Sequence, residues 1–291
     1  MKLAVASCAK LQQTNPQPVW AEIMAERPDV LLLLGDNIYL DKDNHSVPAA
    51  LAAELRARYR DQFAEPNFGA LLSDLRARGG ELLAIYDDHD FLGNDRYGGD
   101  HDPALGIAAR QEFVRAFEPA RTGEDVYNLR RIGPADIVVL DARFYRRSPS
   151  QSGGDRDAVL GAKQWAWFEQ AVAASTADYL VVASSTTGHT WGNESWEQYP
   201  GAFARLRSLL GGRRGALLLT GDVHRNAVFD DSGIVEIVSS GVARNSFVFQ
   251  RPRKNYAIMT FGPADVHVEL KSLKDSGRFD FRIPLANWQL P

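Results

Sequence analysis

Three apolar runs of the sequence are each followed at once by aspartate or histidine. The runs and their polar ends occupy residues 31–36, 82–90 and 217–224. Each run is typical of a strand buried on both faces, and the ligands of open α/β sheets bind outside the carboxyl ends of the strands. If the three strands are neighbours, their side chains converge, and converging aspartate and histidine bind metal ions.

The acidic groups at these ends are crowded. A Gly-Asp pair after an apolar run is usually only a turn. Asp87, Asp88 and Asp90, however, place three carboxylates within four residues, and these repel one another unless a cation neutralises them. With Asp222 and His224 at a third strand end, the pattern favours a metal site over three unrelated turns.

The ligand types indicate the chemistry of such a site. Carboxylates suit hard cations such as calcium, whereas imidazole and thiolate suit transition metals. A bridging carboxylate such as Asp36 could hold two metals about 3.5–4 Å apart. Such a pair supplies a metal-bound hydroxide as nucleophile and neutralises the charge that develops on a phosphoryl group. The strand ends therefore predict a site for two metals that is suited to phosphoryl chemistry.

Three further candidates also follow strand ends, and their roles stay open. Cys8 ends the first strand and is either a small buried residue or a thiolate ligand. Arg143 either clamps phosphate oxygens or pairs with a nearby carboxylate. His189 is a ligand, a phosphate contact or a bystander. The aromatic residues that follow it either cap the core or line a substrate pocket; they are Trp191, Trp196 and Tyr199.

Composition limits the class of protein. The 291 residues carry a net charge of −4, which argues against a general nucleic-acid-binding surface, and 45% of them are hydrophobic, enough for a sizeable core. No apolar run reaches the ~20 residues of a membrane span. The apolar part before Cys8 is shorter than the ~7–15 residues of an export signal, so we expect a cytoplasmic protein with a reduced thiol.

Several other chemistries lack their motifs. The sequence contains no G-x-S-x-G nucleophile elbow and no G-x-x-x-x-G-K-[ST] phosphate loop. No glycine fingerprint follows the first strand, and a single cysteine excludes both an internal disulfide and a cysteine-based zinc knuckle. The acidic strand ends therefore remain the candidate site.

The elements that position these residues alternate along the chain. Helical spacing predicts helices at 15–27, 48–63, 68–78, 105–117, 160–174 and 203–210. Apolar runs predict strands at 2–8, 29–34, 82–86, 125–131, 136–140, 179–184, 217–220, 234–239, 245–249, 256–261 and 266–270. This order predicts an α/β fold with a pair of mixed sheets and helices outside.

The motifs resemble those of the calcineurin-like metallophosphatase superfamily, and most closely its alkaline phosphatase D, or PhoD-like, branch. The resemblance runs from Cys8 to His224 in the family's order and covers most of the chain. The stretches that carry it are Ala6-Ser7-Cys8, Gly35-Asp36-x-x-Tyr39, Asp87-Asp88-His89-Asp90, Leu140-Asp141-Ala142-Arg143-Phe144-Tyr145-Arg146, Leu160-Gly161-Ala162-Lys163-Gln164-Trp165 and Gly221-Asp222-x-His224.

The resemblance implies a four-layer α/β/β/α sandwich with two mixed sheets and a centre of two or more metals. The residues implied to bind Fe³⁺ are Cys8, Asp36, Tyr39 and His224. Those implied to surround Ca²⁺ are Asp36, Asp87 or Asp88, Asn94 and Asp222. Zn²⁺, Mn²⁺ and Co²⁺ are the alternative metals. His89 takes the place of the superfamily's catalytic histidine, and Arg143 and His189 are the other catalytic candidates.

The resemblance also sets the expected domain organisation and function. The family often carries an N-terminal β-domain and an export signal, and the sequence shows neither, so we expect a single domain over residues 1–291. We expect an alkaline phosphatase or phosphodiesterase that acts on a phosphoester substrate. The alternative is a non-catalytic metal-binding regulatory module with the same fold. Acidic residues at all three strand ends favour the enzyme, because a lost activity would relax that charge cluster.

Overall fold

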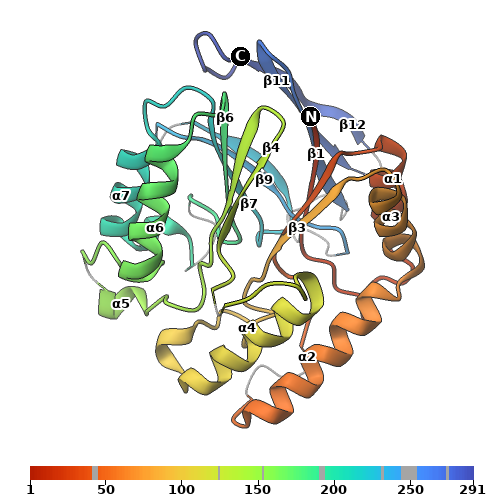
Figure 1. The fold of residues 1–291 in the computed structure, drawn as a ribbon, viewed down its shortest axis with the longest axis vertical. Helices are drawn as coiled ribbons and strands as arrows, with labels where there is room; N and C mark the ends of the chain where they lie inside the picture. Colours follow the sequence, from red (N-terminus) through yellow and green to blue (C-terminus); the bar gives the residue numbers. More distant parts are fainter. Residues whose placement is uncertain are drawn as a thin grey trace.

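Two six-stranded mixed sheets lie face to face, with helices on their outer sides (Figure 1). The structure is a computed structural model that describes residues 1–40, 45–123, 125–152, 154–189, 194–230, 233–243, 254–272 and 275–291. The arrangement confirms the expected α/β fold with two mixed sheets.

The first sheet has the strand order β12-β11-β10-β1-β2-β3. Strands β1, β2 and β3 are parallel to one another, and β10 joins β1 in an antiparallel pair. The strands are β1 (Lys2–Ala6), β2 (Val30–Leu34), β3 (Glu81–Ile85), β10 (Asn255–Phe261), β11 (Asp265–Ser272) and β12 (Asp275–Pro284).

The second sheet has the order β4-β5-β6-β7-β9-β8. Its four central strands are parallel, and the two edge strands β4 and β8 are antiparallel to their neighbours. The strands are β4 (Asn128–Ile132), β5 (Ala135–Val139), β6 (Tyr179–Ser184), β7 (Ala216–Thr220), β8 (Asn226–Phe229) and β9 (Val235–Ser239).

The helices cover the sheets from several sides. Helices α6 and α7 lie outside the second sheet, α1 and α3 outside the first, and α2 and α4 pack together below both sheets in this view (Figure 1). Six helices begin with proline, whose missing N–H is not needed in the first turn. The helices are α1 (Pro18–Glu26), α2 (Pro48–Phe63), α3 (Pro66–Ala77), α4 (Pro103–Phe117), α5 (Pro149–Ser152), α6 (Gly161–Ala174) and α7 (Pro200–Leu210).

The core explains why the strands read as continuous apolar runs. All five residues of β2 are buried, because this strand has neighbours on both edges and apolar layers on both faces. Strand β5 alternates between two clusters: Ile137 and Val139 face the interior between the sheets, and Val138 packs under α6 and α7. Trp165, Trp196 and Tyr199 belong to that outer cluster, so they cap the core.

Most predicted elements are confirmed within a few residues, and two strands were missed. Helix α2 and strand β6 have the expected bounds. The missed strand β8 has only four residues, and the missed strand β12 alternates polar and apolar residues without a sustained apolar run. The strand expected at 245–249 and Trp191 lie outside the described residues.

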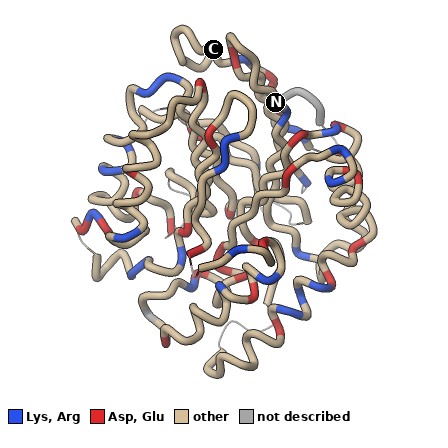
Figure 2. The backbone as a smooth tube through the Cα atoms, viewed as in Figure 1, with Lys and Arg blue, Asp and Glu red and all other residues tan. Residues whose placement is uncertain are grey.

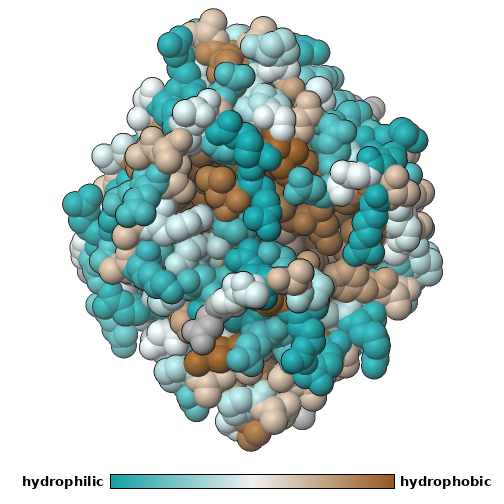
Figure 3. All heavy atoms as spheres, viewed as in Figure 1, coloured by the Kyte–Doolittle hydropathy of each residue, from teal (hydrophilic) through white to brown (hydrophobic). Residues whose placement is uncertain are grey.

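Charge is distributed over the whole surface. Figure 2 shows acidic and basic positions interspersed along the backbone, with several acidic positions near the centre where the strands end. On the face drawn in Figure 3, apolar residues gather near the middle and hydrophilic residues dominate the flanks. In the part of the chain that the structure describes, no helix combines the length and apolar character needed to cross a membrane.

Candidate metal centre

The three acidic strand ends meet, although they come from both sheets. Strands β2 and β3 are parallel neighbours, so Asp36 and the turn that begins at Asp87 follow adjacent ends. Gly221 follows strand β7 of the second sheet and packs against the end of β2. If Gly221 carried a Cβ atom, that atom would lie 2.8 Å from the carbonyl oxygen of Leu34. At Gly35, an added Cβ would lie 2.5 Å from the Cβ of Asp87. Only glycine lets these ends approach so closely.

Strained backbone is concentrated at the same place. Among the described residues, seven that are not glycine have a positive φ. Four of them are predicted ligands: Cys8 (60°), Asp36 (52°), Asp222 (70°) and His224 (56°). Such conformations cost on the order of 1–3 kcal/mol each and are typical of functional sites, where the surrounding fold holds them. Here the strain turns four side chains inward at the strand ends.

The ligand atoms of these residues form overlapping groups. In each group the candidate atoms lie within 4.8 Å of one another. The groups are Cys8, Asp36 and His224; Asp36, Asp88 and His89; Asp87, Asp88 and Asp222; and Asp88, Asp95 and Glu194. Asp36 belongs to two of these groups and Asp88 to three, so the carboxylates connect one donor set to the next.

Asp36 is the centre of the first group. Its Oδ2 accepts a hydrogen bond from the Tyr39 hydroxyl at 2.7 Å and lies 3.4 Å from the Cys8 sulfur. Cys8 and Tyr39 are fully buried, and the thiol also contacts Ser240 Oγ at 3.1 Å. The structure therefore brings together the four residues that the family resemblance assigns to one metal. Cys8 therefore lies in the cluster. Its contacts are compatible both with a thiolate that binds metal and with a thiol that only packs in the core.

Among the described residues, Arg146 is buried beside the cluster and contacts the Glu194 carbonyl, whereas Arg143 is the buried cation that contacts its carboxylates. Its Nε donates to Asp87 Oδ1 at 2.5 Å and its Nη1 to Glu194 at 2.8 Å, so the interpretation as a salt bridge holds. Its Nη2 is buried with no hydrogen-bond partner, as is Asp87 Oδ2. One guanidinium facing several carboxylates leaves the cluster short of positive charge.

The pKa directions follow from this excess of acid. Burial, and then the nearby carboxylates of Asp88 and Asp87, raise the pKa of Asp36 well above its usual range. Burial and then Asp36 likewise raise the pKa of the Cys8 thiol. Burial opposes the ionisation of Asp88, but Arg143, His89 and the Asp95 N–H lower its pKa. A bound cation would reverse the first two shifts, because it favours the charged forms.

The predicted histidines lie in different surroundings. His89 is half-buried beside the cluster, where its ring lies 4.1 Å from the ring of Tyr39 at a tilt of 34° and its backbone N–H donates to Asp88 Oδ1 at 2.7 Å. His189 belongs to none of the donor groups. Its Nδ1 lies 2.6 Å from Glu236 and its ring stacks on Phe229 at 4.4 Å. A role for either histidine in the reaction stays a prediction.

The remaining predicted ligand and two unpredicted carboxylates lie in loops. Asn94 is exposed in the loop that follows Asp90, and its assignment as a ligand stays a prediction. Its neighbour Asp95 gives its backbone N–H to Asp88 at 2.6 Å and joins Glu194 in a donor group. Glu194 carries no strand-end signal, and only its acidic type in a loop after a strand could have suggested it.

The whole chain matches one family of sequences. The profile of the family described as PhoD-like phosphatase matches residues 3–290. The chain belongs to the PhoD-like phosphatase family. A search of curated proteins returned no significant match to this PhoD-like phosphatase.

Solved structures with the same fold support the architecture. A dimetal phosphatase from Danio rerio superposes with a TM-score of 0.58 at 14% identity, covering 98% of this chain and 99% of that one. GAP50 of Plasmodium, described as the anchor in the inner membrane complex, superposes with a TM-score of 0.55 at 12% identity, covering 97% and 88%. At such identities the likeness shows the fold of the PhoD-like phosphatase alone.

The residues of this PhoD-like phosphatase fit a centre with more than one metal. Carboxylates, imidazole, thiolate and phenol are all present within one cluster, and they suit both hard cations and transition metals. The buried and unpartnered Asp87 Oδ2 is an acceptor for which the described residues offer no donor. Metal ions would supply the missing positive charge.

Proposed function

We propose that residues 1–291 form a single phosphoester hydrolase domain that works with two or more metal ions. The observation that carries the proposal is the position of Asp36 between two donor groups, one with Cys8 and His224 and the other with Asp88 and His89. Membership of the PhoD-like phosphatase family supports a phosphoester substrate.

The metals of the proposal differ between the two halves of the cluster. Cys8, Tyr39, Asp36 and His224 would hold Fe³⁺, because thiolate and phenolate are ligands of a transition metal. The residues for Ca²⁺ are Asp36, Asp87 or Asp88, Asn94 and Asp222. Zn²⁺, Mn²⁺ and Co²⁺ remain the alternatives. When bound, such ions activate a water as nucleophile and neutralise charge on the phosphoryl oxygens.

The chain's own side chains would bind the substrate and supply the proton. Arg143 Nη2, which has no partner, is the group proposed to hold a non-bridging phosphoryl oxygen. Its other nitrogens stay on Asp87 and Glu194, which fix the plane of the guanidinium. His89 is proposed to give its proton to the leaving oxygen. His189 is the second candidate for this acid.

A non-catalytic role with the same fold is the competing proposal. GAP50, one of the structures with this fold, is described as an anchor, so the architecture alone does not require catalysis. The overlapping donor groups favour the enzyme, because an anchor needs no buried carboxylates without counterions.

The test combines metal analysis with a substrate panel. The purified protein is stripped with a chelator, reloaded with single metals and pairs, and assayed on p-nitrophenyl phosphate and bis(p-nitrophenyl) phosphate. We expect at least two bound ions per chain and hydrolysis of one or both esters that the chelator abolishes. A protein that binds two ions and hydrolyses neither these esters nor poorer ones would support the competing role.

The absorption spectrum tests the proposed iron site separately. Thiolate and phenolate ligands of Fe³⁺ give coloured charge-transfer bands, so Cys8→Ser and Tyr39→Phe should each change the visible spectrum of the loaded protein. A colourless, fully active preparation that contains only zinc would refute the iron assignment and leave Cys8 as a packed thiol.

The cytoplasmic location is part of the proposal. Cys8 lies two residues after the end of β1, which is placed between β2 and β10 in the first sheet. A processed chain that starts at a lipid-modified Cys8 would lack β1, and finding it by mass spectrometry would overturn this location.

A further inference from the structure

A pocket of about 610 Å³ lies beside helix α4, apart from the metal centre. Its apolar wall includes Ile107, Val114 and Phe144. Ile107 is 44% exposed and is one of two large apolar side chains that the structure leaves so open among the described residues. The volume falls within the range of about 300–1,000 Å³ that small-molecule sites occupy.

The polar lining of this pocket is mainly cationic. Three cations, Arg110, Arg115 and Lys163, line it together with one carboxylate, Asp125. Asp125 is shared, since Lys163 contacts it at 2.7 Å and Arg110 at 3.3 Å. Two of the three cations therefore depend on a single counterion within the lining, which favours an anionic ligand.

Arg110 lines the pocket, and one nitrogen of its guanidinium group has no hydrogen-bond partner. It is only 5% exposed, and its guanidinium stacks 4.0 Å from the ring of Phe144. Its contacts to Asp125 and Asp141 are long, at 3.3 and 3.4 Å, and its Nε has no hydrogen-bond partner. A buried charged donor without a partner is costly, so an additional anion beside Arg110 would be stabilising.

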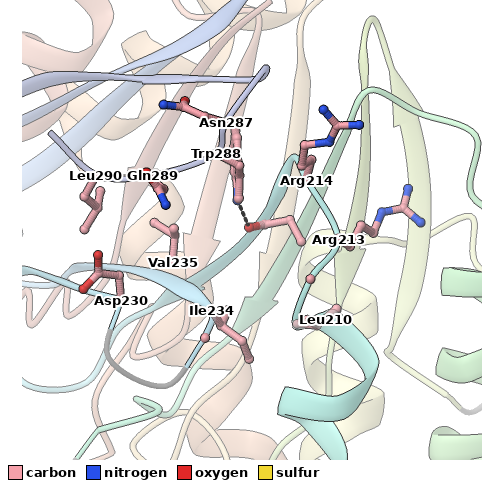
Figure 4. A pocket seen from close by; sticks show the side chains of 13 residues that line it. Leu210, Arg213, Arg214, Asp230, Ile234, Val235, Asn287, Trp288, Gln289 and Leu290 are labelled. Carbon is pink, nitrogen blue, oxygen red and sulfur yellow. Dashed lines mark hydrogen bonds between the residues drawn. The ribbon is translucent and has the colours of Figure 1, made fainter.

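A second pocket provides a comparison, because the arginines that line it already have hydrogen-bond partners. It measures about 340 Å³ and lies between the end of α7 and the C-terminal segment that contains Trp288 (Figure 4). The guanidinium of Arg213 donates to the carbonyls of Val172 and Ser175, and that of Arg214 donates to the carbonyl of Ala286. These cations are occupied by backbone, so this pocket offers no comparable site for an anion.

We propose that the pocket beside α4 binds a small amphipathic anion. The ligand has a flat or branched apolar body, which packs between Ile107, Val114 and Phe144, and one anionic oxygen group. That group lies among Arg110, Arg115 and Lys163. Both parts are required: an inorganic anion lacks the apolar contacts, and a neutral body leaves the cations without a partner.

The test uses 1-anilinonaphthalene-8-sulfonate as a fluorescent probe on the folded, full-length protein. We expect one saturable site. If 2-naphthoate displaces the probe and 2-naphthol and inorganic sulfate do not, the site requires both the apolar body and the negative charge of the ligand. Displacement by sulfate alone, or no saturable binding up to about 1 mM probe, would overturn the proposal.

The variants are matched by position and exposure. Arg115→Ala and Lys163→Ala should each weaken probe binding by about 2–5-fold, the size expected for exposed charge contacts. Arg56→Ala is the control, because Arg56 and Arg115 are both 58% exposed and both pair with Glu112 Oε1, at 2.7 and 2.9 Å. Arg56 does not line the pocket. Equal weakening by all three variants would show a general charge effect and contradict the proposal.

Two further variants place the probe. Ile107→Trp fills the pocket from its exposed rim and should abolish probe binding without disturbing the core. Asp36→Asn alters the metal centre and should leave probe binding unchanged. Loss of binding in Asp36→Asn with retention in Ile107→Trp would place the probe at the metal centre and refute the site beside α4.

Discussion

Two buried clusters of this protein each combine carboxylate with histidine, and they are balanced in opposite ways. Around Glu236 every acceptor has a donor: Oε1 accepts from the Gly188 N–H and the Thr220 hydroxyl at 2.8 and 2.7 Å, and Oε2 lies 2.6 Å from His189. Around Asp36 the carboxylates face one another, and Asp87 Oδ2 has no partner.

The difference separates a structural network from a binding site. A buried polar network in which all groups are satisfied stabilises the fold, whereas an excess of like charge destabilises the metal-free protein unless a ligand compensates it. Removal of a residue should therefore affect stability at Glu236 and activity at Asp36.

The largest effect is expected from Asp36→Asn. The change weakens both donor groups that Asp36 joins. Bound metal ions lower the barrier to phosphoryl transfer by several kcal/mol, and each 1.36 kcal/mol corresponds to a tenfold change in rate. We expect hydrolysis to fall by about 10⁴-fold or more, with metal content reduced and the fold retained by circular dichroism. Activity within threefold of the parent would exclude Asp36 as a bridging ligand.

The next largest effect compares the two histidines. His89→Ala should lower turnover of esters with poor leaving groups by about 10²–10⁴-fold, the value of general acid catalysis. The loss should be smaller for p-nitrophenyl esters, whose leaving group needs no proton, and metal content should be unchanged. His189→Ala is the matched variant, and we expect a smaller loss for every ester. If His189→Ala shows the leaving-group dependence instead, the two roles are reversed.

Glu236→Gln tests the satisfied cluster. The amide presents an NH₂ group to donors that now reach a carboxylate, so we expect unfolding in urea to become easier by about 1–3 kcal/mol. Activity of the folded variant should stay within about threefold. A variant with unchanged stability and lost activity would show that Glu236 takes part in the reaction and is not a structural residue.

The smallest effect is a slope of stability with pH. Burial raises the pKa of Asp87 from its usual value to about 6, despite Arg143, and burial and the neighbouring acids raise the pKa values of Asp36 and Asp222 well above their usual range. The folded state therefore holds protons that the unfolded state releases near pH 4. Its stability is highest below that pH and declines as pH rises through 6.

Urea midpoints with and without chelator measure this slope. The metal-free protein should lose stability between pH 4 and pH 7, and the metal-loaded protein should not, because a cation favours the charged carboxylates. If the metal-free protein gains stability over this range, the protein's own hydrogen-bond donors and cations are sufficient to stabilise the ionised carboxylates without a metal.

The sequence predicted the elements with strong apolar patterns and the convergence of the acidic strand ends, but not the individual contacts that join them. Strand β2 was evident from its leucines, whereas β8 is half-buried along its length and gave no signal. The contact of Cys8 with Asp36 depends on the parallel register of β1 and β2, which spacing alone does not provide. Glu236 was not predicted, although a charge inside an apolar strand requires a partner and could have indicated its network.

The place of β1 has a consequence for how the protein is made. About 250 residues separate the end of β1 from β10, its antiparallel partner, and the carbonyl of Cys8 accepts a hydrogen bond from the later Ala243 at 3.1 Å. At about 5–20 residues per second, a ribosome needs on the order of 10 to 50 s to supply these partners. During that time one edge of β1 is open to mispairing, and the first sheet cannot close. The nascent chain therefore completes the first sheet only when translation is almost finished.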